Sequence, residues 1–196
     1  MARPKEFNEV DVLDRAVNVF WCRGYEGTSV QDLVNGLGIN RASLYDTYGD
    51  KFSLYQKALD RYRQTRQAGL CFLLDQKRPA LEIVQLLLDG VVGESLADPD
   101  HKGCFLVNAA MELANREPHV ATLVADNQRA FEANLQRLLA RGQTEGTITR
   151  IHSAAELAQY LFGLMSGLKV LGKTAPDATM LNGVVRIAMR TLRATT

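Results

Sequence analysis

A short stretch near the N-terminus carries side chains that can hydrogen-bond to DNA, at spacings that one helix would bring together. Arg41 can bond a guanine bidentately, which reads a base. Hydroxyl and ammonium groups bond phosphate oxygens, which fixes position without reading sequence. Four such side chains follow, namely Ser43, Tyr45, Tyr48 and Lys51. These residue types predict DNA recognition.

The elements around these side chains are predicted to be two helices joined by a tight turn. Thr28 begins the first helix, with Gln31 three residues later as in a capping box, and Asn40 caps the second. Gly38 lies where the turn requires a positive φ. The N–H groups at Thr28 and Ser29 form a helix N-terminus that can bind a further phosphate. The pattern is that of a helix–turn–helix.

The same pattern also fits a plain pair of packed helices that binds no DNA. Asp46 and Asp50 lie near the proposed DNA face and favour that alternative. Residues 1–66 hold ten basic and nine acidic side chains, in a chain whose formal net charge is +1. Because phosphate contacts supply much of protein–DNA affinity, binding here must depend on a few well-placed cations.

The whole chain is predicted to be helical, which makes the fold class all-α with about nine helices. Apolar residues recur at helical spacing, strand-like alternation is absent, and prolines fall at segment edges. A first helix is expected from the cap at Asn8 to about Arg23. After residue 50, helices are expected to about residue 74, from residue 79 to a loop at 97–102, and at 103–115, 118–141, 153–171 and 177–192.

Composition argues against several other classes of protein. No apolar run approaches the roughly 20 residues of a membrane span, and the first ten residues lack an apolar signal core, so a cytoplasmic protein is expected. The three cysteines lie far apart and the three histidines are scattered, so neither a metal nor another cofactor is expected. An enzyme is not expected either, because the chain lacks a phosphate loop, a G-x-S-x-G elbow and an H-E-x-x-H motif.

Residues 15–59 resemble the DNA-binding domain of the tetracycline-repressor (TetR/AcrR) family of bacterial transcription regulators. The resemblance is carried by F-x3-G-Y-x-G-T-S-V at residues 20–30, L-G-I at 37–39 and S-L-Y-x3-G-x-K at 43–51. It implies a ligand-responsive regulator, most often a repressor, that binds a palindromic operator in double-stranded DNA as a dimer. A small-molecule effector then releases the protein from DNA.

This resemblance also implies a division of the chain, with a three-helix DNA-binding domain at residues 1–50 and a helical effector-binding and dimerisation domain at residues 51–196. The alternative is a helical interaction protein that uses its helix–turn–helix for a protein partner. Near-neutral charge keeps that alternative open.

Candidate DNA contacts follow from matching positions to the family pattern. Those on the recognition helix are Asn40 at its cap and then Arg41, Ala42, Ser43, Tyr45 and Thr47. Those matching backbone-contact positions are Thr28, Ser29, Tyr48 and Lys51. Arg41 departs from the small, Gln or Lys residues common at its position, so we expect it to set operator preference. Arg3 and Lys5 precede the domain as a basic arm.

The last two predicted helices carry enough apolar residues for a homodimer interface. They hold Leu157, Leu161, Leu164, Met165, Leu168 and Leu171, then Met180, Leu181, Val184, Val185, Ala188 and Leu192. Small residues at 163, 166 and 167 permit close helix approach, so two copies would form a four-helix interface with twofold symmetry. An intramolecular core explains many of the same residues, but reading two half-sites requires two recognition helices.

An apolar effector pocket is expected between the other C-terminal helices. Its candidate wall or sensor residues are Cys104, Phe105, Asn108, Met111 and Phe131, with Glu112, Asn127 and Gln128 as further polar candidates. An apolar or electrophilic effector fits this lining better than a highly charged one. Cys104 follows Lys102 and opens a helix, which favours a reactive thiolate. The alternative is a buried, inert cysteine.

Overall fold

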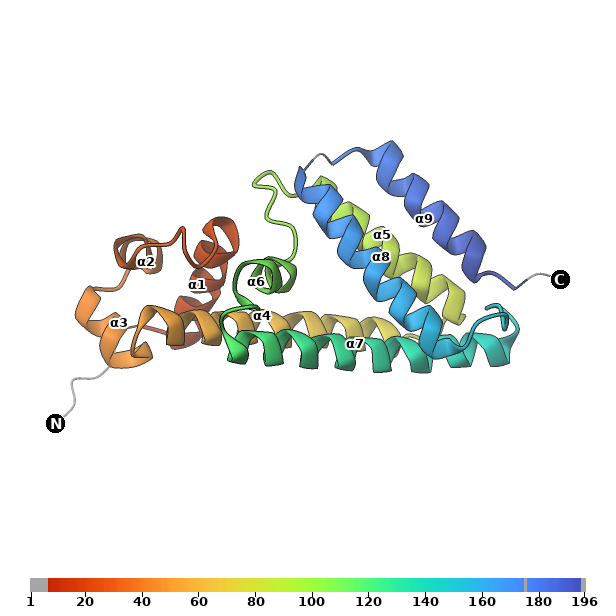
Figure 1. Cartoon of the computed structure of the whole chain (residues 1–196), viewed down its shortest axis with the longest axis horizontal. Coiled ribbons are helices and arrows are strands. Elements are labelled where there is room, and N and C mark those ends of the chain that lie inside the picture. The colour runs from red at the N-terminus through yellow and green to blue at the C-terminus, as the bar shows by residue number, and fades with distance from the viewer. Residues whose placement is uncertain (1–6, 175, 195–196) are drawn as a thin grey trace. The chain divides into compact units, whose positions relative to one another are not determined.

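The computed structural model describes residues 7–174 and 176–194, and over these residues the chain forms nine α-helices (Figure 1). They are α1 (Glu9–Arg23), α2 (Val30–Leu37), α3 (Arg41–Tyr48), α4 (Lys51–Leu74), α5 (Ala80–Leu96), α6 (Phe105–Leu113), α7 (Pro118–Glu145), α8 (Ala154–Thr174) and α9 (Ala178–Leu192). An isolated β-bridge joins Ile148 and Arg193. The all-α prediction with about nine helices is confirmed. The predicted basic arm at Arg3 and Lys5 lies outside the described residues.

The helices form two compact units. Unit 1 takes in the described residues up to Thr65 together with Phe105–Val124, and unit 2 takes in Arg66–Cys104 and the described residues from Ala125 onwards. The long helices α4 and α7 each continue from one unit into the other. In sequence order α6 follows α5, yet it belongs with α1, α2 and α3. The functional division at residue 50 stays a prediction.

Unit 1 is built around aromatic side chains from α1, α4 and α6. Phe20, Tyr55 and Phe105 are fully or almost fully buried, and their rings meet edge to face, with centroids 5.1 Å and 5.5 Å apart. Tyr62 contacts Trp21 and Phe105 in the same way, at 5.0 Å and 5.7 Å. Such pairs add about 0.5–1.5 kcal/mol each beyond the area that they bury. These contacts fix the inward face of α4 in unit 1.

The helix–turn–helix consists of α2, a short turn and α3. Gly38 ends α2 in the left-handed region, with φ of 66°, which a residue with a Cβ rarely adopts. Asn40 caps α3 as predicted, since its side chain accepts a hydrogen bond from the Ser43 N–H at 2.8 Å. The predicted capping box at Thr28 and Gln31 is wrong by one residue, because Ser29 caps α2 and exchanges hydrogen bonds with Asp32.

Unit 2 is a bundle in which α5 packs against both α8 and α9. Its core is aliphatic, and Leu88, Leu161 and Leu181 are fully buried. Each such side chain contributes roughly 1.5–3 kcal/mol of transfer free energy. The carboxylate of Glu94 joins α5 to α8 by accepting a hydrogen bond from Lys169 at 2.6 Å. Burial raises the pKa of Glu94, but this bond and a second one from Arg66 outweigh it and leave the pKa below its ordinary value.

Candidate DNA-binding site

The exposed face of α3 presents the side chains that the sequence nominated for base contact. Arg41, Ala42 and Tyr45 are exposed, and Ser43 and Thr47 are partly exposed. The Arg41 guanidinium lies over the ring of Tyr45, 5.6 Å from its centroid, because residues four apart share a helix face. Leu44 is fully buried and fixes the helix against the rest of unit 1. Apart from Arg41 and Tyr45, the candidate side chains on this face are the small Ala42, Ser43 and Thr47.

Two of the predicted phosphate contacts lie inside unit 1 instead. Thr28 is 1% exposed, and its hydroxyl donates to the Gly24 carbonyl at 2.6 Å. Tyr48 is 3% exposed, and its hydroxyl donates to the Glu9 carbonyl at 3.4 Å. Burial raises the pKa of the Tyr48 hydroxyl. Both side chains hold the domain together, so neither offers DNA a free surface hydroxyl.

Three cations on or near α3 have no ion-pair partner among the described residues. Arg41, Lys51 and the exposed Lys57 have no carboxylate within 4.0 Å among the described residues. In contrast, several other arginines of this unit are paired locally: Arg23 with Asp32, Arg61 with Asp14, Arg63 with Asp60 and Arg116 with Glu26. The near-neutral charge count therefore conceals a few free cations placed at or beside α3.

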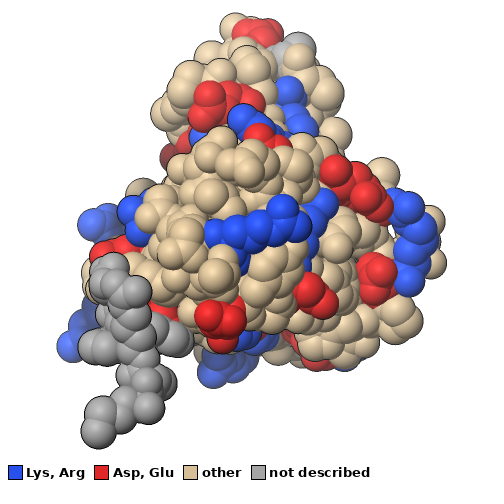
Figure 2. All heavy atoms as spheres, turned by 90° about the vertical axis from the view of Figure 1, so that its left-hand side faces the viewer, with Lys and Arg blue, Asp and Glu red and all other residues tan. Residues whose placement is uncertain are grey.

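The surface view agrees with this local placement. On the face turned to the viewer in Figure 2, Lys and Arg are interspersed with Asp and Glu over a largely uncharged surface. DNA contact on such a surface depends on individual side chains and on helix N-termini rather than on a continuous basic patch. Lys57 is a further candidate for DNA contact that could not be recognised from the sequence, because a lone lysine on an amphipathic helix is usually only solvated.

Family models match both parts of the chain. "Bacterial regulatory proteins, tetR family" matches residues 12–58, which include the whole helix–turn–helix. "Tetracyclin repressor-like, C-terminal domain" matches residues 81–188, more than half of the chain. The chain belongs to the TetR family. It is a DNA-binding transcriptional regulator, as the resemblance in residues 15–59 predicted.

Individual relatives cover almost the full length. The uncharacterized HTH-type transcriptional regulator YezE of Bacillus subtilis is 34% identical and aligns over 98% of this chain and 100% of its own. The HTH-type transcriptional repressor ComR of Escherichia coli is 28% identical over 97% of this chain and 90% of its own. A cysteine-substituted variant of the TetR regulator CifR, solved with a 26-bp double-strand operator, is 28% identical over 97% of this chain and 100% of its own, with a TM-score of 0.84.

The five residues predicted to sense the effector are divided between the two units of this TetR-family chain. Phe105 is buried in the aromatic core of unit 1, whereas Met111 on the same helix is 83% exposed. Asn108 is partly exposed in unit 1. Phe131 belongs to unit 2, where its ring meets Phe162 of α8 with centroids 5.7 Å apart. The fifth residue, Cys104, is the last residue of its segment of unit 2.

Cys104 precedes α6 in a loop organised by carboxylates. Its thiol is partly exposed and is not part of a disulfide. The Asp98 carboxylate accepts hydrogen bonds from the N–H groups of Lys102 and Gly103 at 2.6 Å and 3.2 Å. The Lys102 ammonium lies 3.0 Å from Asp98 and 3.0 Å from Asp100, and these contacts, led by Asp98, raise the pKa of Lys102. The charge expected to activate the thiol is therefore engaged by two carboxylates.

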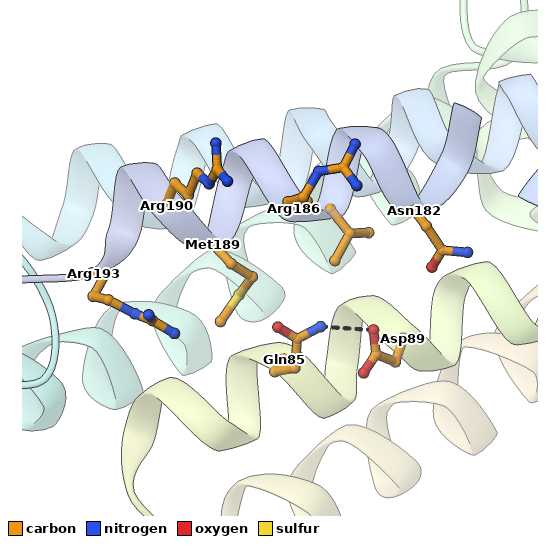
Figure 3. A pocket seen from close by; sticks show the side chains of 8 residues that line it. Gln85, Asp89, Asn182, Arg186, Met189, Arg190 and Arg193 are labelled. Atoms are coloured by element: carbon orange, nitrogen blue, oxygen red, sulfur yellow. Dashed lines mark hydrogen bonds between the residues drawn. The ribbon is translucent and has the colours of Figure 1, made fainter. Parts of the chain in front are cut away.

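A cavity of about 290 Å³ lies between α5 and α9. Its lining is Gln85, Asp89, Asn182, Val185, Arg186, Met189, Arg190 and Arg193, and none of these was predicted from the sequence to contact an effector. Figure 3 shows the Gln85–Asp89 hydrogen bond on the α5 side, while Arg186 and Arg190 rise from α9 away from it. In a small-molecule site, a few polar groups converge on one point, and the polar groups of this cavity do not.

An apolar surface on α8 and α9 matches the predicted dimer helices. On α8, Tyr160 and Val170 are exposed, and Gly163 and Gly167 between them have open space beside them. On α9, Ile187 is 57% exposed while its neighbours Ala188 and Met189 are buried. One side of this helix pair thus packs into unit 2 and the other keeps apolar groups at the surface.

Among the described residues, no helix is long and apolar enough to cross a membrane.

Proposed function

We propose that this TetR-family chain is a ligand-responsive repressor that binds a palindromic operator as a homodimer in the bacterial cytoplasm. The observation that carries the proposal is the exposed face of α3, where the Arg41 guanidinium lies over the Tyr45 ring and has no carboxylate partner among the residues that the structure describes. ComR, a named repressor, and CifR, solved with operator DNA, support it as relatives of similar length.

The proposed contacts fall into two classes. Arg41 reads a base, with Ala42, Ser43, Tyr45 and Thr47 lining the same helix. Ser29, Asn40 and Lys51 contact phosphates, the first two from the capped N-termini of α2 and α3. Thr28 and Tyr48 act indirectly, by holding these helices in place.

The proposal is tested by a gel shift with DNA from upstream of the chain's own gene, repeated at rising salt. A complex whose affinity falls steeply and linearly in log–log form with salt marks phosphate contacts. Absence of binding at every salt concentration would contradict the proposal and favour the interaction-protein alternative. In that case a pull-down should retain a protein partner through α3.

For the effector, we propose an apolar or electrophilic small molecule. CifR was solved as cysteine-substituted variants, which supports testing Cys104 first. If the Cys104 thiol is the sensor, an electrophile should release the wild-type protein from DNA and leave Cys104→Ser bound. Cys71→Ser is the matched control, because the Cys71 thiol is likewise partly exposed and lies in unit 2. Equal release of all three proteins would show that Cys104 is not the sensor.

A thermal-shift screen of apolar compounds tests for an effector that binds without reacting with a thiol.

A further inference from the structure

The turn between α1 and α2 in unit 1 is fixed by a carboxylate from α6. Glu112 accepts a hydrogen bond from the Tyr25 N–H at 3.0 Å through Oε2 and another from the Glu26 N–H at 2.8 Å through Oε1. Two successive backbone N–H groups directed at one anion are a strong local arrangement, because charged acceptors strengthen hydrogen bonds. The bonds connect residues more than 80 positions apart in the sequence.

Gly24 makes room for this carboxylate. Its φ is +74°, a conformation that favours glycine. A Cβ built at Gly24 would lie only 2.9 Å from Oε2 and 3.0 Å from Oε1 of Glu112. Arg116 adds a second connection, since its guanidinium donates to the Glu112 carbonyl at 2.9 Å and lies 3.7 Å from the Glu26 carboxylate. The contact with Glu112 on α6 thus explains why the first residue of the G-Y-x-G motif is glycine.

The fixed turn leads directly to two proposed DNA contacts. In one direction, the Thr28 hydroxyl ties the turn to the Gly24 carbonyl, and the next residue, Ser29, caps α2. In the other direction, the Tyr25 ring supports Lys51, whose ammonium lies 4.2 Å from the ring centroid. A cation over an aromatic face is held there by the ring quadrupole. The backbone of Tyr25 is bound by Glu112 while its ring sets the position of Lys51.

We propose that Glu112 is a positioning residue for DNA binding, holding the α1–α2 turn so that the Tyr25 ring places Lys51 for a phosphate contact. The inference rests on the proposed function, because Lys51 must face DNA. It changes the role expected of Glu112 from the sequence, since the carboxylate is engaged by unit 1 backbone rather than offered to an effector.

The direction in which one substitution changes DNA affinity distinguishes this positioning role from a simple effect of charge. Glu112→Gln removes a negative charge, which by itself strengthens binding to a polyanion. As a positioning residue, however, Glu112 is needed as a double acceptor. A glutamine offers one acceptor oxygen, and its NH2 group would face the other backbone N–H. The α1–α2 turn would then be held less firmly, the Tyr25 ring would no longer position Lys51, and DNA affinity would fall.

The experiment is a fluorescence-anisotropy titration of the operator fragment found in the gel shift, at several salt concentrations. Glu112→Gln should bind about tenfold more weakly, the order expected for a lost hydrogen bond to a charged group. Its log–log salt slope should shrink by about 1, as for Lys51→Ala. The double variant that combines Glu112→Gln with Lys51→Ala should bind DNA only slightly more weakly than Lys51→Ala alone. The charge-matched control is Glu132→Gln, whose carboxylate bonds Gln128 within α7. This control should bind as tightly as the wild type or more so.

Tyr25 gives a second test that does not depend on how Glu112→Gln folds. Tyr25→Phe keeps the ring and should retain the wild-type slope, whereas Tyr25→Leu keeps both backbone N–H groups, loses the ring and should lose about 1 from the slope. The inference is overturned if Tyr25→Leu has the wild-type slope, or if folded Glu112→Gln matches Glu132→Gln. A loss of affinity in Glu112→Gln at unchanged slope, alongside a lower melting temperature, would mark a merely structural role and also overturn it. Wild-type protein that binds no DNA would overturn the proposed function instead.

Discussion

Arg41 occupies the first position of α3, where a side chain can reach a base edge while its backbone stays near the phosphates. Its guanidinium lies beside the Tyr45 ring rather than a carboxylate, so DNA would not have to displace an ion pair. A planar group with five donors matches the two acceptors of guanine, which a lysine at the same position would contact with less geometric specificity.

Arg41→Ala should weaken operator binding by about 1–3 kcal/mol and relax the preference at one base pair in each half-site. The measurement is anisotropy against a set of operators that each carry one base change. Lys57→Ala is the control, because Lys57 is another free cation of unit 1. That control should lower affinity evenly across the set. An equally even loss in Arg41→Ala would show that Arg41 contacts only phosphate.

Hydroxyl side chains are the residues whose roles the sequence predicted least well. Thr28 and Tyr48 have the chemistry of phosphate contacts, and both are buried with their hydroxyls bonded to backbone carbonyls. A hydroxyl serves equally well at a surface, at a helix cap or in a turn, so its type alone does not distinguish these places. The exposure of Arg41 was predictable, because arginine is rarely buried.

At the scale of elements, the short helix α2 depends on its first turn. A helix of eight residues has little stability of its own, so its cap and its packing must hold it. Ser29 and Asp32 form a reciprocal capping box, and Arg23 adds an ion pair to Asp32. The hydrogen bonds from the Ser29 hydroxyl and N–H, with Arg23, lower the pKa of Asp32 to about 2.

Ser29→Ala should destabilise unit 1 by about 1 kcal/mol at neutral pH, which lowers the melting temperature by roughly 2–4 °C in a chain of this size. Asp32 has a lower pKa in the folded chain than its ordinary 3.8, so its contribution is present above that value and is lost as the pH falls through about 2. The difference between wild type and variant should therefore narrow between about pH 5 and pH 2. Thermal unfolding followed by circular dichroism measures it.

Ser43→Ala is the matched control for this prediction, since it makes the same change in α3 at a position that is not a cap. Its melting temperature should stay within a degree or so of the wild type, as surface substitutions away from caps usually do. A constant gap between wild type and Ser29→Ala across the whole pH range would show that Asp32 does not couple to the cap.

Helix positions were largely predictable, and the contacts between distant helices were not. Asn40 and Gly24 mark helix ends through local hydrogen bonds and backbone conformation, which the sequence records within a few residues. The cap of α2 was misplaced by one residue because Thr28 and Ser29 are both good caps. The bond from Glu112 to the α1–α2 turn has no local signal, because it arises only when α6 packs into unit 1.

At the scale of the whole molecule, the chain is organised as two units that share α4 and α7. The sequence order hides this, since α6 lies between two segments of unit 2. Two of the effector candidates, Phe105 and Phe131, are apolar residues on neighbouring predicted helices, and they belong to different units. Apolar type predicts burial but not which core a side chain joins.

The homodimer interface is the last property that belongs to the whole molecule. Ile187 on α9 and Val170 on α8 keep apolar side chains at the surface although the opposite sides of both helices are buried. An exposed apolar face on a helix pair favours a partner, and in a TetR-family chain two recognition helices are needed for two half-sites. We therefore place the dimer interface on this face.

Ile187→Asp should split the dimer, because two carboxylates near a twofold axis would be desolvated and would repel each other. Sedimentation should show a monomer at concentrations where the wild type is a dimer, and operator affinity should fall at least tenfold, since each half-site would then bind alone. Ile151→Asp is the control, because Ile151 is 77% exposed in the connector before α8. It should remain dimeric with unchanged affinity. A dimeric Ile187→Asp would place the interface elsewhere on unit 2, and circular dichroism would establish that the variant is folded.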